Sequence, residues 1–189
     1  MGQASFFGLT LATAGGVMTP RPASEELVTL AAERIGRRPA RVADVGTGSG
    51  AIAVAIALAA PRAEIWASDV SAAAVLLARA NAHRLGVGNR VHVLHGDLLT
   101  PIAGTLDLIV ANLPYLPRDD RDRYADLARE PDTAVFAAGD GLGPYRRLLT
   151  AAEEKLRPDG AVAIQLHRQV FTAERDALST LRATLPAVA

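Results

Sequence analysis

Hydrophobic residues in this chain form short apolar runs that alternate with longer amphipathic or alanine-rich segments. The short runs predict buried strands at residues 42–45, 64–69, 91–94, 106–111 and 161–166. The other segments predict helices at residues 25–35, 51–60, 72–85, 144–156 and 170–185. Strands that alternate with helices are typical of a mostly parallel sheet with helices on both faces. We therefore expect an α/β fold.

Residues 1–22 stand outside this alternation and are predicted to form an N-terminal hairpin or arm. Two apolar stretches, at residues 6–11 and around Val17, are separated by Gly15 and Gly16. A glycine pair between apolar runs is typical of a turn. The hydrophobic side chains of this segment therefore need a cover from the rest of the protein.

The remaining residues, 23–189, are expected to form a single domain, because a chain of 189 residues that is half hydrophobic can bury one core. Ser24 is a predicted N-cap for the helix at residues 25–35. We expect Arg21, just before it, to be a solvated surface charge, as most arginines are.

Composition narrows the classes of function. Lys and Arg together number 20, as do Asp and Glu, so the formal charge is zero and no basic excess indicates a nucleic-acid partner. The absence of cysteine excludes disulfides, thiol nucleophiles and thiolate metal sites. No cationic leader is visible, and the longest apolar run, residues 51–60, is half a membrane span. We expect a soluble cytoplasmic protein without a membrane partner. The four histidines lack metal-ligand spacing, so no metal site is predicted and they are interpreted as structural or surface residues.

A glycine-rich turn between the strand at 42–45 and the helix at 51–60 is the first candidate site. Glycine allows unusual backbone angles and lets a ligand lie across a helix N-terminus. The predicted binding residues of this turn are Gly46, Thr47, Gly48, Ser49 and Gly50, together with Asp44 ahead of it.

The glycines alone leave the ligand open, because Gly46, Gly48 and Ala51 also satisfy the loose dinucleotide fingerprint. Asp44 favours a ligand with positive charge. S-adenosylmethionine, which carries a sulfonium and an ammonium group, is such a ligand.

Acidic residues end two further strands on the same edge of the sheet. Asp69 lies nineteen residues after Gly50, where a carboxylate can accept both hydroxyls of an adenosine ribose; the alternative is a charge or cap at the next helix. Asp97 could accept the exocyclic amine of an adenine, or could instead cap its own loop. Leu98 is included with Asp97 in the predicted cofactor site.

The second candidate site is the tetrad Asn112-Leu113-Pro114-Tyr115, which directly follows the strand at 106–111. A planar amide or aminopurine nitrogen is a poor nucleophile, so an enzyme must hold it in place. The Asn112 side-chain oxygen and the Leu113 carbonyl can accept its two N–H bonds, and Tyr115 offers an aromatic wall. These acceptors also stabilise positive charge on the nitrogen as a methyl group transfers. The alternative is an Asn-x-Pro turn that merely closes a strand. The charged stretch that follows, residues 116–129, predicts a solvated loop or short helix over the mouth of the site.

Together these motifs resemble those of class I S-adenosylmethionine-dependent methyltransferases. More narrowly, FFGLTL followed by TPRP, then NLPY, then EP with DGL, resemble the HemK-type protein N5-glutamine methyltransferases, which methylate the glutamine of the Gly-Gly-Gln loop in peptide-chain release factors. The resemblance covers Phe6 to about Gln169. It implies a Rossmann-like sheet and S-adenosylmethionine as cofactor, with Asp69 binding the ribose and Asn112 also contacting the cofactor. It further implies that Asn112 to Tyr115 are the catalytic residues and that a release factor is the protein partner.

The chain departs from the family pattern at several points. Leu113 replaces the usual proline, and Gln165-Leu166-His167 stands where an acid and a glycine are common. From the resemblance we expect no counterpart here of the family's N-terminal helical domain or of the last two strands of its sheet. We therefore expect the strand at 161–166 to be an open edge, completed by a partner such as a second copy in a homodimer, or by the N-terminal arm.

The leading hypothesis is a methyltransferase acting on a protein glutamine. One alternative is an N6-adenine methyltransferase on DNA or RNA, which the same Asn-x-Pro-Tyr geometry would serve, although a neutral chain argues against nucleic acid. Another is a cofactor-binding module with little or no catalysis. A nicotinamide-dependent oxidoreductase would leave Asn112 to Tyr115 unexplained.

Overall fold

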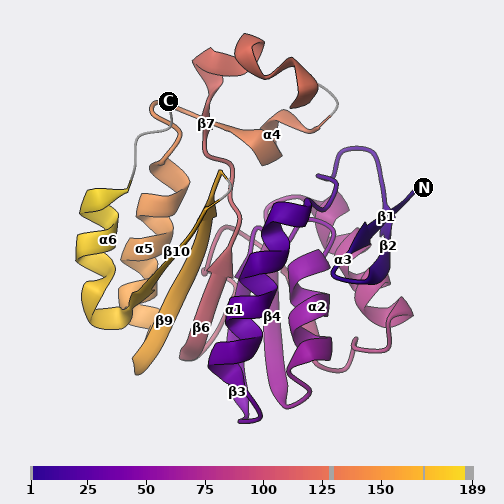
Figure 1. Cartoon of the computed structure of the whole chain (residues 1–189), viewed down its shortest axis with the longest axis vertical. Coiled ribbons are helices and arrows are strands. Elements are labelled where there is room, and N and C mark those ends of the chain that lie inside the picture. Colours follow the sequence, from indigo (N-terminus) through magenta and orange to yellow (C-terminus); the bar gives the residue numbers. More distant parts are fainter. Residues whose placement is uncertain (1, 128–129, 168, 186–189) are drawn as a thin grey trace.

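A six-stranded sheet forms the centre of the computed structural model, which describes residues 2–127, 130–167 and 169–185. The strand order is β10-β9-β6-β3-β4-β5. All strands are parallel except β10, which runs antiparallel to β9 (Figure 1). Their bounds are β3 (Ala40–Val45), β4 (Ala63–Asp69), β5 (Val91–His95), β6 (Leu106–Ala111), β9 (Leu156–Leu166) and β10 (Gln169–Glu174).

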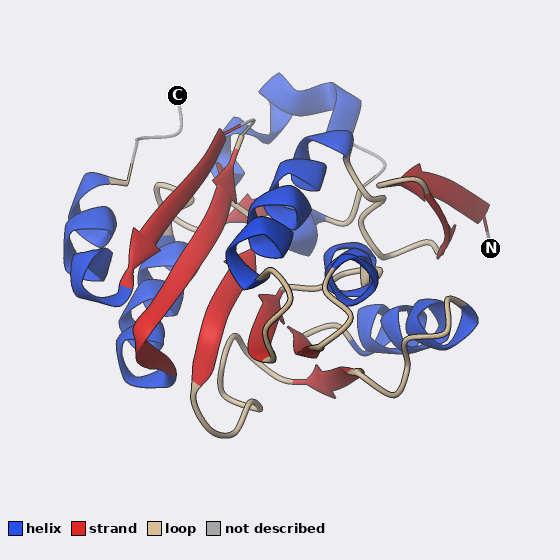
Figure 2. Cartoon of the chain, turned by 60° about the horizontal axis from the view of Figure 1, so that its bottom comes forward, coloured by secondary structure: helices blue, strands red, loops and turns tan. Residues whose placement is uncertain are grey.

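Helices cover both faces of the sheet (Figure 2). One face carries α1 (Glu25–Ile35), α2 (Ala51–Ala59) and α3 (Ala72–Arg84), and the other carries α5 (Gly143–Lys155) and α6 (Leu178–Thr184). Because both faces are covered, every residue of β6 is buried, as its continuous apolar run requires. The predicted α/β fold is confirmed, and it is Rossmann-like.

The C-terminal part of the prediction is wrong. Residues 170–185 were expected to form one helix, but the structure has β10, then a 3₁₀ turn, η3 (Arg175–Ala177), and then α6. His167 takes a positive φ of 55° and reverses the chain, so that Gln169 pairs with Leu166 and Glu174 pairs with Ala161. The β-branched and aromatic residues of β10 suit a strand better than a helix.

The β9 edge is therefore not open, since the chain itself supplies the next strand. This removes the reason to expect a homodimer or the N-terminal arm at that edge. Residues 156–160, between the predicted helix and the predicted strand at 161–166, lie within β9, where the pairing with β6 shifts register between Leu106 and Leu108.

An N-terminal hairpin is present, but its turn is not where the glycine pair indicated. Strands β1 (Gly2–Phe6) and β2 (Leu9–Thr13) are joined by Phe7 and Gly8, whose φ angles of 49° and 71° match the twist of a two-residue hairpin. The buried Asn81 of α3 holds β2 by accepting from Ala12 N (2.9 Å) and donating to Ala12 O (3.1 Å). The hairpin therefore packs on the helical layer.

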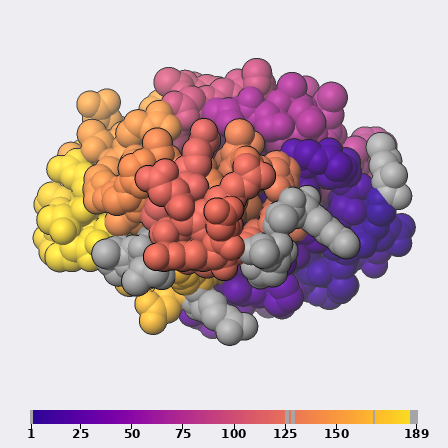
Figure 3. Space-filling view, turned by 90° about the horizontal axis from the view of Figure 1, so that it is seen from above, coloured from indigo at the N-terminus to yellow at the C-terminus, as the bar shows by residue number. Residues whose placement is uncertain are grey.

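A cap lies over the carboxyl ends of the strands (Figures 1 and 3). It consists of β7 (Leu116–Pro117), the 3₁₀ segment η2 (Arg118–Leu127), α4 (Asp132–Val135) and β8 (Phe136–Ala137), with β7 paired to β8. Seen from above, η2, in red, crosses this face between the N-terminal and C-terminal parts of the chain (Figure 3). Residues 116–129 were expected to form a solvated loop or a short helix, and η2 is the helical alternative; residues 128 and 129 lie outside the described residues. A further 3₁₀ turn, η1 (Pro22–Ser24), precedes α1. Across the described part of the chain, no helix combines the length and the apolar character that crossing a bilayer would need.

Candidate active site

The glycine turn is built by close packing as well as by backbone angle. Gly46 and Gly50 have φ angles of 72° and 79°. A Cβ at Gly46 would lie 2.7 Å from Leu113 Cδ2, and one at Gly50 would lie 2.9 Å from Ala78 Cβ. At Gly50 a larger residue would press on the α3 backbone. At Gly46 the positive φ disfavours a larger residue, and the Leu113 side chain would also have to move.

Asp44 lies beneath this turn and does not reach the cavities above it. Its Oδ2 accepts from Thr47 Oγ1 (2.6 Å) and from Ala53 N (3.1 Å), whereas Oδ1 has no partner among the described residues. Burial raises the pKa of Asp44 to about 6. The Asp44 carboxylate thus joins the turn to α2 through these hydrogen bonds. It does not face a ligand, contrary to what the sequence suggested.

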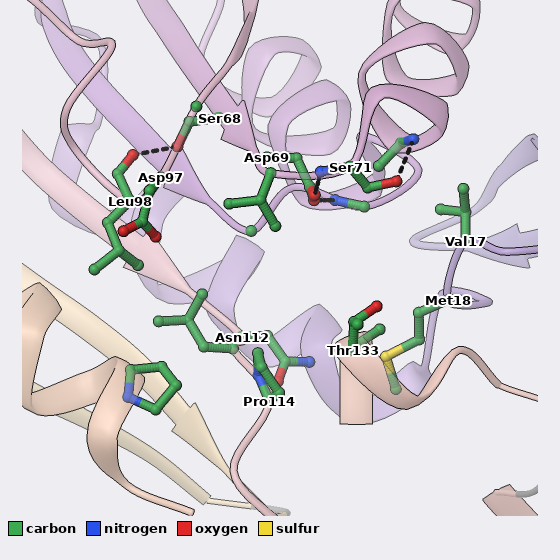
Figure 4. A pocket seen from close by; sticks show the side chains of 18 of the residues that line it. Val17, Met18, Ser68, Asp69, Ser71, Asp97, Leu98, Asn112, Pro114 and Thr133 are labelled. Carbon is green, nitrogen blue, oxygen red and sulfur yellow. Dashed lines mark hydrogen bonds between the residues drawn. The ribbon is translucent and has the colours of Figure 1, made fainter. Parts of the chain in front are cut away.

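A cavity opens between the turn and the tetrad (Figure 4). Asp69 and Asp97 lie along one side, and Asn112 and Pro114 lie opposite. The other predicted residues lining it are Gly46, Gly48, Leu98 and Leu113. A neighbouring cavity, which shares Met18 with the first, is lined by Thr47 and Ser49. Neither Asp44 nor Gly50 lines either of these two spaces.

Asp69 sits at the end of β4 and orders the backbone around it. Its Oδ2 accepts from Gly48 N (2.9 Å) and its Oδ1 from Ser71 N (2.8 Å). Asp69 therefore acts as a local cap, the alternative to ribose binding that the sequence left open. Because each carboxylate oxygen has two acceptor sites, Asp69 keeps capacity for hydroxyl donors of a ligand in the cavity.

Asp97 is held by a residue that sequence reasoning missed. Arg147 of α5 contacts Asp97 Oδ2 at 2.6 Å, and both residues line the cavity. Leu98, with a φ of 48°, accepts a hydrogen bond from Ser68 Oγ (2.7 Å) at its carbonyl. The loop after β5 is thereby fixed against the end of β4.

Asn112 has its amide plane set by Ser24, the residue just before α1. Its Nδ2 donates to Ser24 Oγ at 2.9 Å. This bond turns Oδ1 into an acceptor that faces away from Ser24. Ser24 occupies the N-cap position as predicted, but its side chain makes no capping bond and serves Asn112 instead.

A buried tyrosine, also missed from sequence, fixes the rest of the tetrad. The Tyr145 hydroxyl accepts from Leu113 N (2.9 Å) and lies 2.5 Å from Gln165 O and 3.1 Å from Leu113 O. One proton serves only one carbonyl, and the shorter contact is to Gln165, which leaves Leu113 O able to accept from a ligand. Burial raises the pKa of Tyr145, so the hydroxyl stays protonated. The available signal was a tyrosine at the start of a predicted core helix, whose hydroxyl needs a partner.

The sequence motifs meet around this site. Glu130 accepts from Arg21 Nη2 (2.9 Å) and from Thr19 N (3.1 Å). The Arg21 side chain is 41% exposed, as expected of a surface charge, but it is also ion-paired, which was not expected. A Cβ on Gly141 would lie 2.0 Å from Tyr115 O, which explains a glycine in the DGL segment.

Tyr115 itself borders a third cavity rather than the first. Its ring centroid lies 5.0 Å from that of His167, and burial raises the pKa of its hydroxyl. Gln165 lines the same space, as does Asn112. Asn112 thus stands between the first and third cavities, where a cofactor and a methyl acceptor would have to meet.

Comparisons with known proteins agree with this geometry. Residues 21–129 match the family model described as "Methyltransferase small domain". The chain is 39% identical over 178 residues to the release factor glutamine methyltransferase of Moorella thermoacetica, covering 93% of this chain and 63% of that protein. It is 43% identical over 166 residues to the release factor glutamine methyltransferase of Bordetella pertussis, covering 86% of this chain and 61% of that protein.

Among solved structures, the ribosomal protein L11 methylase of Lactobacillus delbrueckii subsp. bulgaricus superposes with a TM-score of 0.57 at 26% identity, covering 79% of this chain and 62% of that one. The chain spans about three fifths of the length of the curated relatives it matches. Since the family model covers more than half of the chain and includes both the glycine turn and the tetrad, the chain belongs to the methyltransferase small domain family.

Proposed function

We propose that this protein is an S-adenosylmethionine-dependent methyltransferase that methylates the side-chain amide nitrogen of a glutamine in a protein, with the Gly-Gly-Gln loop of a peptide-chain release factor as substrate. The observation that carries the proposal is the position of Asn112, whose amide is oriented by Ser24 at the junction of two cavities. The proposal also places the protein in the cytoplasm, where release factors act.

The residues around the first cavity fit the cofactor. The backbone of Gly46 and Gly48 leaves one wall bare of side chains, which suits the methionine end. Asp69 is available to the ribose hydroxyls, and Asp97 and Leu98 border the place for adenine. Thr47 and Ser49 line the adjoining space. When bound, the cofactor would supply an electrophilic methyl group on a sulfonium.

The tetrad would hold the amide nitrogen of the substrate. Asn112 Oδ1 and Leu113 O are two acceptors for its two N–H bonds. Ser24 fixes the first acceptor and Tyr145 fixes the second. The nitrogen would therefore keep one orientation toward the methyl group during the reaction. Partial negative charge on these oxygens also stabilises the positive charge that develops on nitrogen. Pro114 keeps Leu113 extended, which directs its carbonyl in this way.

The names of the relatives support the choice of substrate. Four of them, from 36% to 43% identical, are release factor glutamine methyltransferases. The Arg21–Glu130 pair, which joins two of the narrower motifs at the acceptor side of the site, agrees with that choice.

Methyl transfer from labelled S-adenosylmethionine to a release factor tests the proposal. The assay is run beside a second release factor in which the glutamine of the Gly-Gly-Gln loop is replaced, and beside an adenine-containing duplex. We expect label only in the first protein. Label in the duplex would favour the adenine alternative, and cofactor binding without label in any substrate would favour a non-catalytic module.

A further inference from the structure

Gln165, at the end of β9, is a buried polar residue that the proposed reaction does not use. Its exposure is 2%, and it borders the third cavity together with Asn112, Leu113 and Tyr115. The side-chain Nε2 donates to His167 O at 3.2 Å. In contrast, Oε1 has no donor among the residues that the structure describes.

The sheet places this oxygen beside the tetrad. Ala111 of β6 pairs with Ile164 of β9, so Asn112 and Gln165 are the next residues on two neighbouring parallel strands. Side chains at equivalent positions of neighbouring strands point to the same face of a sheet. The residues two positions earlier, Val110 and Ala163, share the core beneath α1, which is the face where Ser24 contacts Asn112. Both amides therefore project to this face at the rim of one cavity.

A second contact locks the two strand ends together. The Tyr145 hydroxyl touches Gln165 O and both backbone polar atoms of Leu113. The backbone of Gln165 is thus held at a constant distance from the proposed amide acceptors. The side chain that this backbone carries lines the third cavity.

The orientation of the amide defines what Gln165 can bind. With Nε2 directed to His167 O, the group left without a partner is an acceptor. A buried acceptor without a donor costs free energy, and a ligand with an N–H group at that position removes the cost.

We propose that Gln165 Oε1 accepts a hydrogen bond from a main-chain N–H of the substrate peptide, next to the glutamine, and that Gln165 selects a peptide over an adenine. This inference rests on the proposed function. A peptide carries N–H donors beyond the amide that is methylated. Beside its amino group an adenine presents ring nitrogens that are acceptors, so the Gln165 oxygen would face a second acceptor.

Gln165→Leu removes the acceptor and keeps a similar volume, and Gln165→Glu keeps an acceptor. The control is Gln169→Leu, the same change at an exposed position of β10. With a peptide that contains Gly-Gly-Gln, we expect Gln165→Leu to raise KM about tenfold while kcat stays within about twofold. Gln165→Glu keeps an acceptor but loses the donor to His167 O, so it should raise KM less than Gln165→Leu does. Gln169→Leu should match the wild type.

A peptide series identifies the donor. Each main-chain N–H that flanks the glutamine is replaced in turn by an ester oxygen, and KM is measured with the wild type and with Gln165→Leu. We expect one ester to raise KM for the wild type but not for Gln165→Leu, because both changes remove the same hydrogen bond. The wild-type series stands even where a variant fails to fold: if no ester raises KM, the inference is wrong.

The remaining outcomes separate this inference from the proposed function. An unchanged KM for folded Gln165→Leu, with normal methylation by the wild type, overturns the role of Gln165 alone. If the wild type binds S-adenosylmethionine by calorimetry but methylates no Gly-Gly-Gln peptide or release factor, the proposed function fails and this inference fails with it.

Discussion

Asn112 and Ser24 are 88 residues apart in the chain, yet the Asn112 side chain donates to the Ser24 hydroxyl at 2.9 Å. The bond joins the end of β6 to the start of α1 and gives the Asn112 amide one orientation. An amide that is free to rotate would offer its nitrogen as often as its oxygen to an incoming N–H group. The orientation of the proposed acceptor thus depends on a helix far away in the sequence.

Ser24→Ala should therefore lower the rate of methyl transfer without weakening the binding of the cofactor. Loss of this hydrogen bond, about 1 kcal/mol, predicts a fall in kcat of about fivefold, while the Kd for S-adenosylmethionine stays the same. Calorimetry and initial rates measure the two quantities. Ser5→Ala, at an exposed position of β1, is the matched control. An unaltered kcat would show that Asn112 needs no anchor.

Asn112→Ala should retain most cofactor binding and lose methyl transfer by about 10²-fold or more, the range seen when one preorganised polar group is removed from a site. The proposed acceptor Oδ1 disappears, whereas Gly46, Gly48 and Asp69 are untouched. Single-turnover rates with labelled cofactor measure the effect. Activity equal to that of the parent would exclude Asn112 from catalysis.

Asp69→Ala should act on the cofactor instead. The change removes the carboxylate proposed for the ribose and also the acceptor that orders Gly48 N and Ser71 N. Loss of hydrogen bonds to a charged group predicts a Kd for S-adenosylmethionine raised by about tenfold to 100-fold. Asp176→Ala, on the exposed η3 turn, is the control. Equal affinity in variant and parent, determined by calorimetry, would remove the ribose assignment.

Asp44 should make stability depend on pH. Its pKa is raised by burial to about 6 in the folded protein, from an ordinary value of 3.8. A raised pKa means that the folded state favours the protonated acid, so the contribution is full below about pH 4 and is lost as the pH rises through about 6. The loss amounts to about 3 kcal/mol.

Urea unfolding of the wild type and of Asp44→Asn between about pH 4 and pH 7 measures the contribution of Asp44 to stability. Asparagine cannot ionise and still offers an oxygen to Thr47 and Ala53. The free energy of unfolding of the wild type should fall relative to the variant between about pH 4 and pH 7. A relative rise over the same range would mean that the pKa is lowered in the folded state.

Local sequence patterns were enough for most of the sheet and for one wall of the site. Apolar runs located β3 and β6, because a strand covered on both faces has few polar positions. Strands β4 and β5, in which buried positions alternate with half-buried ones, were located as well. The glycine turn was visible because the positive φ angles at Gly46 and Gly50 and the close approach of Ala78 to Gly50 favour residues without a side chain. The same pattern could not separate strand from helix in residues 169–174, since a short apolar segment fits both.

What only the tertiary structure decided is which distant residues meet. The pairing of β10 with β9, the Arg21–Glu130 bridge and the contact between Ser24 and Asn112 all join segments whose local sequences carry no sign of each other. Tyr145 and Gln165 likewise gain a role only when β9 and α5 pack against the end of β6. Residue types and spacing determine the backbone conformation of each segment. The partner of a buried polar group is determined by packing, because its hydrogen bond has to be satisfied by whichever element the fold brings next to it.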